Sequence, residues 1–411
     1  MNAQLSINGD RLWSRLVTMA QFGALPAGGC NRQALTDEDL AGRNQFIQWC
    51  ESIGCQIRID SIGNIFARLA GEDDKLSPVI TGSHLDTQPS GGKYDGIYGV
   101  LAGLEVLETI VESGGRPRRP LEVVVWTNEE GCRFDTAMMG SAVWSGVMPQ
   151  SEAYALADRD GKTVEAELKR IGHLGDVPAA AGDVHAALEL HIEQGPVLEA
   201  EQLEVGVVTG VQHMSRHRIL ILGQEAHAGP TPMNLRKDPV MALSGLLPPL
   251  YELAAKHGPD GRVTFGFIEA QPGSSNTVPG KLELTVDLRH PKEEHYRAML
   301  SAFDEIVDSA CRHYGLDYSN ECFWEAPGIA FAENCIDAVR ASVKARDYSH
   351  RELVSGAGHD SCNVSTRVPT SMIFIPCEGG LSHNEAENVT PEHVTKGANV
   401  LLDAMLSLAS Q

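Results

Sequence analysis

The sequence predicts an α/β fold with a smaller α+β domain inserted into it. In the first half of the chain, short apolar strands alternate with helices, and several strands end at histidine or acidic residues. After about Gly210 the order becomes strand, helix, strand, strand, helix, strand, and the α/β pattern then returns towards the C-terminus. In open α/β sheets, sites gather at the carboxyl ends of the strands. The polar residues at these strand ends are therefore candidates for function.

The length of the chain supports two domains. With 411 residues and 42% hydrophobic content, the chain exceeds what one hydrophobic core usually organises. The change of pattern places the boundaries so that residues 1–211 and 329–411 form the main domain. Residues 212–328 form the inserted domain.

The elements of the main domain follow from local signals. Thr36 followed by three acidic residues is typical of a helix N-cap with an acidic first turn. Runs of β-branched and aliphatic residues predict buried strands, and apolar residues at helical spacing predict amphipathic helices. The expected strands are 57–59, 65–68, 79–83, 121–127, 187–192 and 371–376, and the expected helices are 10–21, 36–50, 98–113, 335–344 and 391–408.

The inserted segment predicts a ferredoxin-like unit. Its expected elements are strand 216–223, helix 238–257, strand 262–269, strand 281–288, helix 292–314 and strand 317–324. The order β-α-β-β-α-β is typical of a four-stranded antiparallel sheet with two helices on one face.

Charge and cysteine content exclude several classes of partner. There are 33 basic and 55 acidic residues, which gives a net charge of −22, and such a chain repels nucleic acid and anionic membranes. Nine cysteines are scattered and never form a C-x-x-C pair, which favours a reduced cytoplasmic protein. No apolar stretch approaches the ~20 residues that a membrane span needs. We expect a cytoplasmic protein that binds neither nucleic acid nor membrane.

The adjacent acids Glu129 and Glu130 follow the expected strand 121–127. The end of a buried strand is a rigid place from which to project carboxylates, so one glutamate can bind metal while its neighbour moves protons. Upstream, His84 and Asp86 alternate along a strand and leave it on the same side, so the Asp86 carboxylate is expected to orient the His84 imidazole.

Further nitrogen and oxygen donors complete the pattern of a two-metal hydrolase. Asp95 lies among glycines that allow a sharp turn, and one carboxylate can bridge two metal ions about 3.5–4 Å apart. His191 ends another expected strand, and His383 lies near the C-terminus. Taken alone, each of these residues is more typical of a structural role. Together they supply the N and O donors that Zn, Mn, Co or Ni accept.

Eight segments of the chain, in order, resemble the M20 metallopeptidase-like amidohydrolases, and more narrowly their hydantoinase/carbamoylase branch. The resemblance spans nearly the whole sequence. The segments are GSHLDTQPSGGKYDG (82–96), TNEEGCRF (127–134), ELHIEQGP (189–196), GQEAHAGPTPM (223–233), PGSSNTVPG (272–280), DLRHP (287–291), SGAGHDS (355–361) and LSHNEAE (381–387).

The resemblance implies a dinuclear-metal exopeptidase-like catalytic domain, with a mixed sheet flanked by helices, and an inserted lid and dimerisation domain. It implies two divalent metal ions per subunit. The residues implied to hold one ion are His84, Asp95 and His191, and those implied to hold the other are Asp95, Glu130 and His383.

Roles for the remaining site residues also come from the resemblance. Glu129 would be the general base, and Asp86 is expected to act as a positioning residue for His84 rather than as a ligand. His227 would reach the site of the neighbouring subunit in a homodimer and stabilise the developing oxyanion. The residues implied to hold the substrate are Gln194, Asn276, Arg289 and Gly358. Arg289 suits a carboxylate because a planar guanidinium makes two parallel charge-assisted bonds.

The activity implied by the resemblance is cleavage of the carbamoyl C–N bond of N-carbamoyl-L-amino acids or related ureido acids, which releases amino acid, ammonia and CO2. Allantoate amidohydrolase activity is the nearest alternative, followed by a dizinc dipeptidase or N-acyl amino acid deacylase. A serine amidase using Ser274 or Ser275 would need a lysine relay, for which the sequence has no clear motif. A non-catalytic binding protein would be expected to have lost a ligand or the base, and none is missing.

Overall fold

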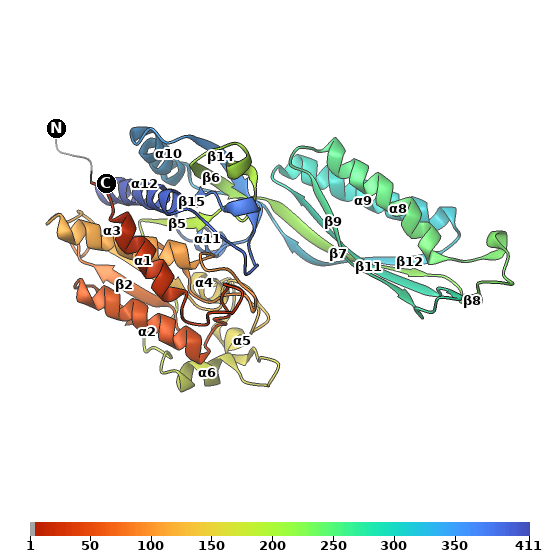
Figure 1. Cartoon of the computed structure of the whole chain (residues 1–411), viewed down its shortest axis with the longest axis horizontal. Helices are drawn as coiled ribbons and strands as arrows, with labels where there is room; N and C mark the ends of the chain where they lie inside the picture. The colour runs from red at the N-terminus through yellow and green to blue at the C-terminus, as the bar shows by residue number, and fades with distance from the viewer. Residues whose placement is uncertain (1–4) are drawn as a thin grey trace. The chain divides into compact units, whose positions relative to one another are not determined.

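The computed structural model describes residues 5–411, which form two compact units. The large unit comprises the chain up to Gly210 together with Ala330–Gln411. The small unit is the segment Val211–Ile329. Figure 1 shows the elements of both units.

The large unit contains a mixed sheet whose strands run in the order β1-β2-β4-β3-β5-β15-β6-β13, with β14 paired to β6. Strands β3, β4, β5 and β15 are mutually parallel neighbours, whereas β1, β2 and β6 pair antiparallel. The strands are β1 (Gln56–Ile59), β2 (Ile65–Leu69), β3 (Val79–His84), β4 (Leu121–Trp126), β5 (Ala186–Ile192), β6 (Val205–Val211), β13 (Ile329–Ala330), β14 (His350–Ser355) and β15 (Thr370–Ile375).

Helices cover both faces of the parallel core, which explains why its strands are buried along their whole length rather than at alternate residues. On one face, Ile80 and Val124 pack with Trp144 of α4 and Val364 of α11. On the other face, Gly103 of α3 lies close against Thr81 and Val123. The helices are α1 (Gly9–Met19), α2 (Asp37–Ser52), α3 (Ile97–Glu112), α4 (Met139–Ser145), α5 (Gln150–Ala155), α6 (Val164–Arg170), α7 (Val197–Ala200), α10 (Glu333–Ala345), α11 (Asp360–Val364) and α12 (Pro391–Ala409).

The long helices and six of the strands of the large unit were predicted to within a few residues, whereas β6, β13, β14 and the short helices were not. Thr36 caps α2 as expected, because its side chain accepts the backbone N–H of Asp39. Helices α4, α5, α6, α7 and α11 each span seven residues or fewer, which is about two turns. So short a segment carries too few apolar positions for a helical period to stand out.

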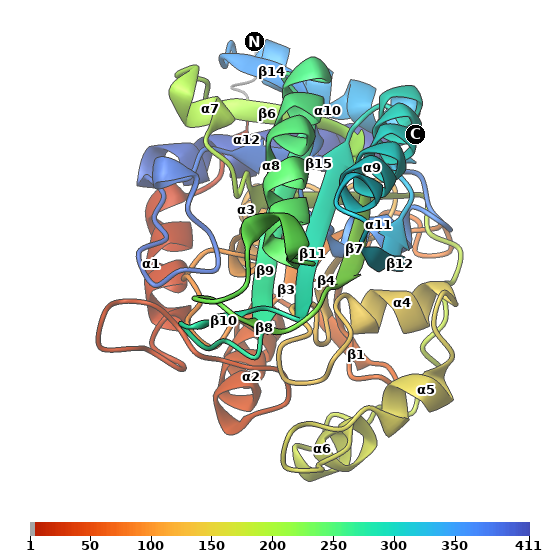
Figure 2. The same cartoon turned by 90° about the vertical axis from the view of Figure 1, so that its right-hand side faces the viewer.

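The small unit has the predicted strand and helix order. Its four-stranded sheet runs β12-β7-β11-β9, and all pairings are antiparallel. Helices α8 and α9 lie side by side on one face of this sheet (Figure 1, Figure 2) and share a core with it that includes Leu246, Leu284 and Phe303. The elements are β7 (His213–Leu222), α8 (Pro239–Lys256), β9 (Arg262–Gln271), β11 (Lys281–His290), α9 (Glu293–His313) and β12 (Asp317–Ala326). A separate two-stranded pair joins β8 (Ala226–His227) to β10 (Thr277–Val278), and a short 3₁₀ turn covers Met233–Leu235.

Among residues 5–411, no helix combines the length and the apolar character that crossing a bilayer would require.

Candidate metal centre

Two buried histidines and a buried aspartate meet at the carboxyl ends of the central parallel strands. His84 is the last residue of β3, His191 is the penultimate residue of β5, and these two strands are neighbours. Asp95 lies in the loop between β3 and α3. Its Oδ1 is 3.1 Å from His191 Nε2 and 3.7 Å from His84 Nε2. We call His84, Asp95 and His191 the inner group.

The other oxygen of Asp95 faces a second set of donors. Asp95 Oδ2 is 3.4 Å from His383 Nε2, and the same nitrogen is 3.3 Å from Glu130 Oε2. We call Asp95, Glu130 and His383 the outer group. The His383 side chain is 52% exposed, whereas every side chain of the inner group is buried.

The two groups fit a pair of divalent cations. Each offers three ligand atoms that lie within 4.8 Å of one another. All the donors are imidazole nitrogens or carboxylate oxygens, which suit borderline transition metals. Because its two oxygens face different groups, Asp95 is arranged as a bridge. The geometry thus brings together the five residues proposed from the sequence as metal ligands.

The absence of a side chain at Gly96 leaves space for the imidazole of His84. Gly96 has a φ of +73°, and a Cβ there would lie 2.3 Å from His84 Nε2, the ligand atom of that imidazole. Both the backbone conformation and the space therefore exclude a side chain.

The charges of Asp95 and His191 depend on each other. Burial alone would lower the pKa of His191, but the hydrogen bond and charge of Asp95 raise that pKa to about 9. Burial alone would raise the pKa of Asp95, yet the neighbouring imidazoles of His191, His84 and His383 hold it well below its usual range. Without a cation, a proton on His191 is thus stabilised by Asp95. Metal binding must displace this proton, so we expect it to weaken as pH falls.

Glu129 lies beside the ligands without belonging to either group. The side chain is buried, and its Oε2 is 3.5 Å from His84 Nε2. Burial raises the pKa of Glu129 well above its usual value, and the nearby carboxylates of Asp360 and Glu130 raise it further. Such a carboxyl group holds a proton more readily than an exposed glutamate, which is the property needed to accept a proton and pass it on.

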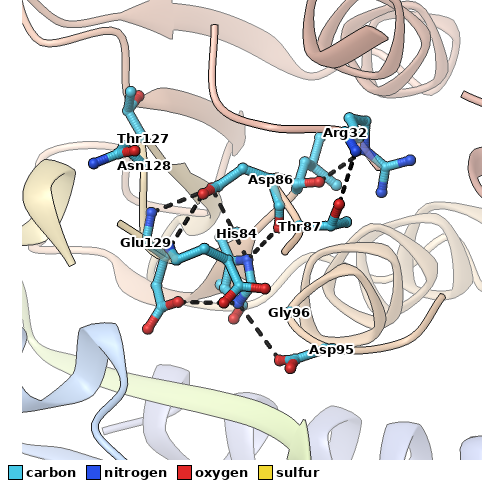
Figure 3. Close-up of polar contacts among 12 residues, drawn as sticks. Arg32, His84, Asp86, Thr87, Asp95, Gly96, Thr127, Asn128 and Glu129 are labelled. Atoms are coloured by element: carbon cyan, nitrogen blue, oxygen red, sulfur yellow. Dashed lines mark hydrogen bonds and ion pairs between the residues drawn. The ribbon is translucent and has the colours of Figure 1, made fainter. Parts of the chain in front are cut away.

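Asp86 does not orient His84 in the way expected from the sequence. The His84 Nδ1 atom is 2.8 Å from the backbone oxygen of Asp86 but 3.9 Å from its carboxylate. The Asp86 carboxylate instead accepts the backbone N–H of Glu129 at 3.2 Å (Figure 3). It also accepts the backbone N–H of Glu130 at 3.1 Å. Side-chain alternation placed Asp86 on the correct side of the strand. The loop after β4, however, brings its own N–H donors to that carboxylate.

The segment carrying His84 and Asp86 is fixed by a buried arginine. The Arg32 Nε donates to the backbone oxygen of Leu85 at 2.8 Å, and the Arg32 backbone N–H donates to Thr87 Oγ1 at 2.8 Å (Figure 3). Nothing in the sequence around Arg32 suggested this role, because Leu85 and Thr87 lie more than 50 residues away.

Sequence reasoning also missed Glu189, two residues before His191 on β5. Its buried carboxylate accepts Ser83 Oγ at 2.8 Å on one oxygen, and Ser361 N at 3.0 Å and Oγ at 2.6 Å on the other. Ser83 directly precedes His84, so this carboxylate ties the two strands that carry the inner histidines. An acid inside an otherwise apolar strand was the available signal.

Two of the residues proposed to hold substrate lie in the large unit. Gln194 Nε2 donates to Asp95 Oδ2 at 2.8 Å, and its buried Oε1 has no protein partner. Gly358 precedes His359, whose ring lies 4.6 Å from that of His191 in an edge-to-face contact. Both are therefore near the inner group.

The other two residues proposed to hold substrate, Asn276 and Arg289, lie in the small unit, as does His227. His227 and Asn276 are close to each other, because His227 of β8 pairs with Thr277 of β10, and the Ala228 N–H donates to the Asn276 backbone oxygen. Arg289, near the end of β11, donates through Nε at 2.6 Å and Nη2 at 3.0 Å to the two oxygens of Asp287. In this structure the planar fork of Arg289 thus holds a carboxylate of its own chain.

Comparisons of sequence and of structure with known proteins agree on one family. The profile described as Peptidase family M20/M25/M40 matches residues 80–407. The N-carbamoyl-L-amino-acid amidohydrolase of Rhizobium meliloti is 43% identical over 98% of this chain and 97% of its own length. The allantoate amidohydrolase of Bacillus subtilis is 32% identical over 95% of each chain. A crystal structure of a hydantoinase/carbamoylase family amidase from Burkholderia multivorans has a TM-score of 0.97 at 46% identity and covers 99% of each chain. This chain therefore belongs to the peptidase family M20/M25/M40.

Proposed function

We propose that this protein hydrolyses the carbamoyl C–N bond of N-carbamoyl-L-amino acids. Water attacks the ureido carbonyl carbon, the bond to the terminal nitrogen breaks, and ammonia leaves. The remaining carbamate then decomposes to the amino acid and CO2. The observation that carries the proposal is the pair of ligand groups that share Asp95. The carboxyl group of Glu129 lies beside them and belongs to neither group. Its support beyond the geometry is the 43% identity to a relative that bears this name.

Two divalent metal ions complete the proposed site. The inner group would hold one and the outer group the other, with Asp95 between them. When bound, such ions polarise a carbonyl group and lower the pKa of a water molecule. Zn, Mn, Co and Ni all suit these donors, and cellular supply decides among them.

Glu129 is proposed to manage the protons. It accepts a proton from the attacking water and later delivers it to the leaving nitrogen, so no net proton is consumed at this residue. Asp86 fixes the backbone from which Glu129 projects, because the Asp86 carboxylate accepts the N–H groups of both Glu129 and Glu130. This makes Asp86 a positioning residue.

The remaining assignments rest on the motif resemblance. Gln194, Asn276, Arg289 and the backbone of Gly358 are proposed to hold the substrate. A substrate carboxylate on Arg289 would have to share the guanidinium with Asp287. The small unit is proposed to act as a lid and as the dimerisation surface of a cytoplasmic homodimer.

The closest alternative substrate is allantoate, which also has a ureido and a carboxylate group, and the relative from Bacillus subtilis carries that name. A dipeptidase or N-acyl amino acid deacylase would use the same metal centre without releasing ammonia. Metal-reconstituted protein should be assayed for ammonia release from N-carbamoyl-L-amino acids, β-ureidopropionate and allantoate, with dipeptides tested for cleavage. Cleavage of dipeptides without ammonia release from any ureido acid would refute the proposal.

The role of His227 has its own test. If this imidazole acts in the partner's site, His227→Ala and Glu129→Gln chains are each inactive but form one complete site per mixed dimer. An equimolar mixture with random pairing should regain about a quarter of wild-type activity. Subunit exchange must be shown separately with tagged chains. If the chains exchange and activity stays absent, His227 serves the site of its own chain or none.

A further inference from the structure

We propose that Glu387 is a positioning residue that joins the loop bearing Asp95 to the loop bearing His383, and thereby assembles the outer metal site. The inference rests on the proposed two-metal function and adds a residue that is neither a proposed metal ligand nor a proposed proton carrier. The Glu387 side chain is almost fully buried, with 1% of the residue exposed.

One oxygen of Glu387 holds the backbone of the bridging residue. Its Oε1 accepts the N–H of Tyr94 at 2.8 Å and the N–H of Asp95 at 3.1 Å. These two donors are almost 300 residues away in sequence, so the contact joins two distant loops. The position of the Asp95 backbone is therefore fixed by a side chain from the C-terminal part of the chain.

The other oxygen of Glu387 reaches the side chain of Asp95 through a serine. Ser382 Oγ lies 3.3 Å from Glu387 Oε2 and 2.7 Å from Asp95 Oδ2, the oxygen that faces His383. Ser382 directly precedes His383, whose backbone φ is +53°. A non-glycine residue in this conformation requires surrounding contacts to hold it. The contacts of Ser382 and Glu387 supply them on one side.

Close packing leaves little freedom for this arrangement. A Cβ built at Gly92 would lie 2.0 Å from Glu387 Cδ, so the Gly-rich loop presses directly on the carboxyl group. Among the described residues, no lysine or arginine forms an ion pair with Glu387. Its hydrogen bonds come from the backbone and from Ser382, and these are the groups whose positions set the outer site.

The inner histidines have a different support. His84 and His191 belong to β3 and β5, which are fixed by the sheet and by Glu189. The outer ligands Glu130 and His383 lie on loops, and Asp95 lies on a loop shared by both groups. Loss of Glu387 should therefore weaken the outer site more than the inner one, which keeps His84 and His191.

The test is a Mn²⁺ titration of the full-length protein by equilibrium dialysis, with metal content measured per chain. We expect two ions in the wild type. In Glu387→Ala, we expect the weaker-binding site to lose affinity by about 10- to 100-fold, as is typical when a group that orients a ligand is removed, while the other site loses clearly less. Glu387→Gln retains a carbonyl oxygen for the Tyr94 and Asp95 N–H groups, so its loss should be smaller. A fold that simply loosened would weaken both sites to the same extent.

Two further variants make the result decisive. Glu385→Ala removes a carboxylate from the same loop that forms no hydrogen bond or ion pair within residues 5–411, so this variant should bind both ions normally. Ser382→Ala keeps the backbone bonds of Glu387 and should weaken the outer site less than Glu387→Ala; it replaces that variant if circular dichroism shows Glu387→Ala to be unfolded. If the wild type binds two ions and the variants lose affinity equally at both sites, or lose none, the role of Glu387 is overturned but the two-metal function is not. Fewer than two ions in the wild type would overturn the two-metal function and this inference together.

Discussion

The inner and outer groups share one aspartate but differ in how the fold supports them. The inner histidines project from adjacent parallel strands, and all three inner side chains are buried. The outer ligands Glu130 and His383 come from loops, and His383 is half exposed. A sheet position is fixed by many backbone hydrogen bonds, whereas a loop position depends on a few side-chain contacts. The inner site should therefore bind its ion more tightly and tolerate substitution of neighbouring residues better. The affinity of the outer site should depend more on the residues around it.

The first prediction separates proton transfer from metal binding. Glu129→Gln should lower kcat by about 10²- to 10⁴-fold, because the amide cannot take a proton from water. Since Glu129 lies outside both ligand groups, metal content should stay at two ions per chain. Ammonia release and metal analysis of the same preparation test this. If Glu129→Gln loses metal as Glu130→Ala does, the roles of the two neighbours must be exchanged.

The second prediction compares one ligand from each group. His383→Ala should lose the outer ion and keep the inner one, whereas His191→Ala should weaken the inner site and also disturb Asp95, which serves both. We expect the affinity lost at the directly altered site to exceed the roughly 10- to 100-fold typical of a supporting residue. Equilibrium dialysis at a fixed pH measures both. Loss of both ions in His383→Ala would show that the two sites do not fill independently.

The third prediction uses Asp86, for which sequence and structure indicate different roles. Asp86→Asn leaves only one good acceptor for the N–H groups of Glu129 and Glu130. If the carboxylate fixes this turn, kcat should fall by about 10- to 100-fold while the inner site keeps its metal affinity. If the carboxylate instead oriented His84, the inner site would lose affinity. Parallel measurements of kcat and inner-site affinity distinguish the two.

The sequence predicted those parts of the fold and site that depend on local pattern. Strand β4 was recognisable from its run of β-branched and aromatic residues, 123–126, because a parallel strand buried on both faces is largely apolar. The ends of such strands then suggested His84, Glu129, Glu130 and His191. Asp95 and His383 lie on loops, where periodicity carries no information, and they were singled out by Gly-rich context and by motif resemblance.

Contacts between distant segments could not be predicted in the same way. Glu387 bonds to Tyr94 and Asp95, and Ser361 bonds to Glu189, yet each pair is separated by well over 100 residues. Nothing in the local sequence tells a buried glutamate in a loop from a solvated one. The orientation of the Asp86 carboxylate was missed for a similar reason, since its partners follow a different strand.

The smallest expected effect concerns the support of the inner site. Ser361→Ala removes the 2.6 Å bond from Ser361 Oγ to Glu189 but keeps the bonds from the Ser361 backbone and from Ser83. Loss of one hydrogen bond to a charged group costs about 1–3 kcal/mol, and part of this cost should appear as lower thermal stability of the metal-free protein. Because β3 and β5 remain paired, inner-site affinity should fall by less than about tenfold, below the range for a lost supporting group.

A control on the same helix makes this small effect interpretable. Ser365→Ala removes a hydroxyl that donates to the Cys362 backbone oxygen at 2.9 Å, at the end of α11 away from Glu189. It should lower thermal stability without changing the affinity of either site. If Ser361→Ala weakened the outer site more than the inner one, Glu189 would not be specific to the strand-borne histidines. The distinction between a sheet-supported and a loop-supported metal site would then have to be abandoned.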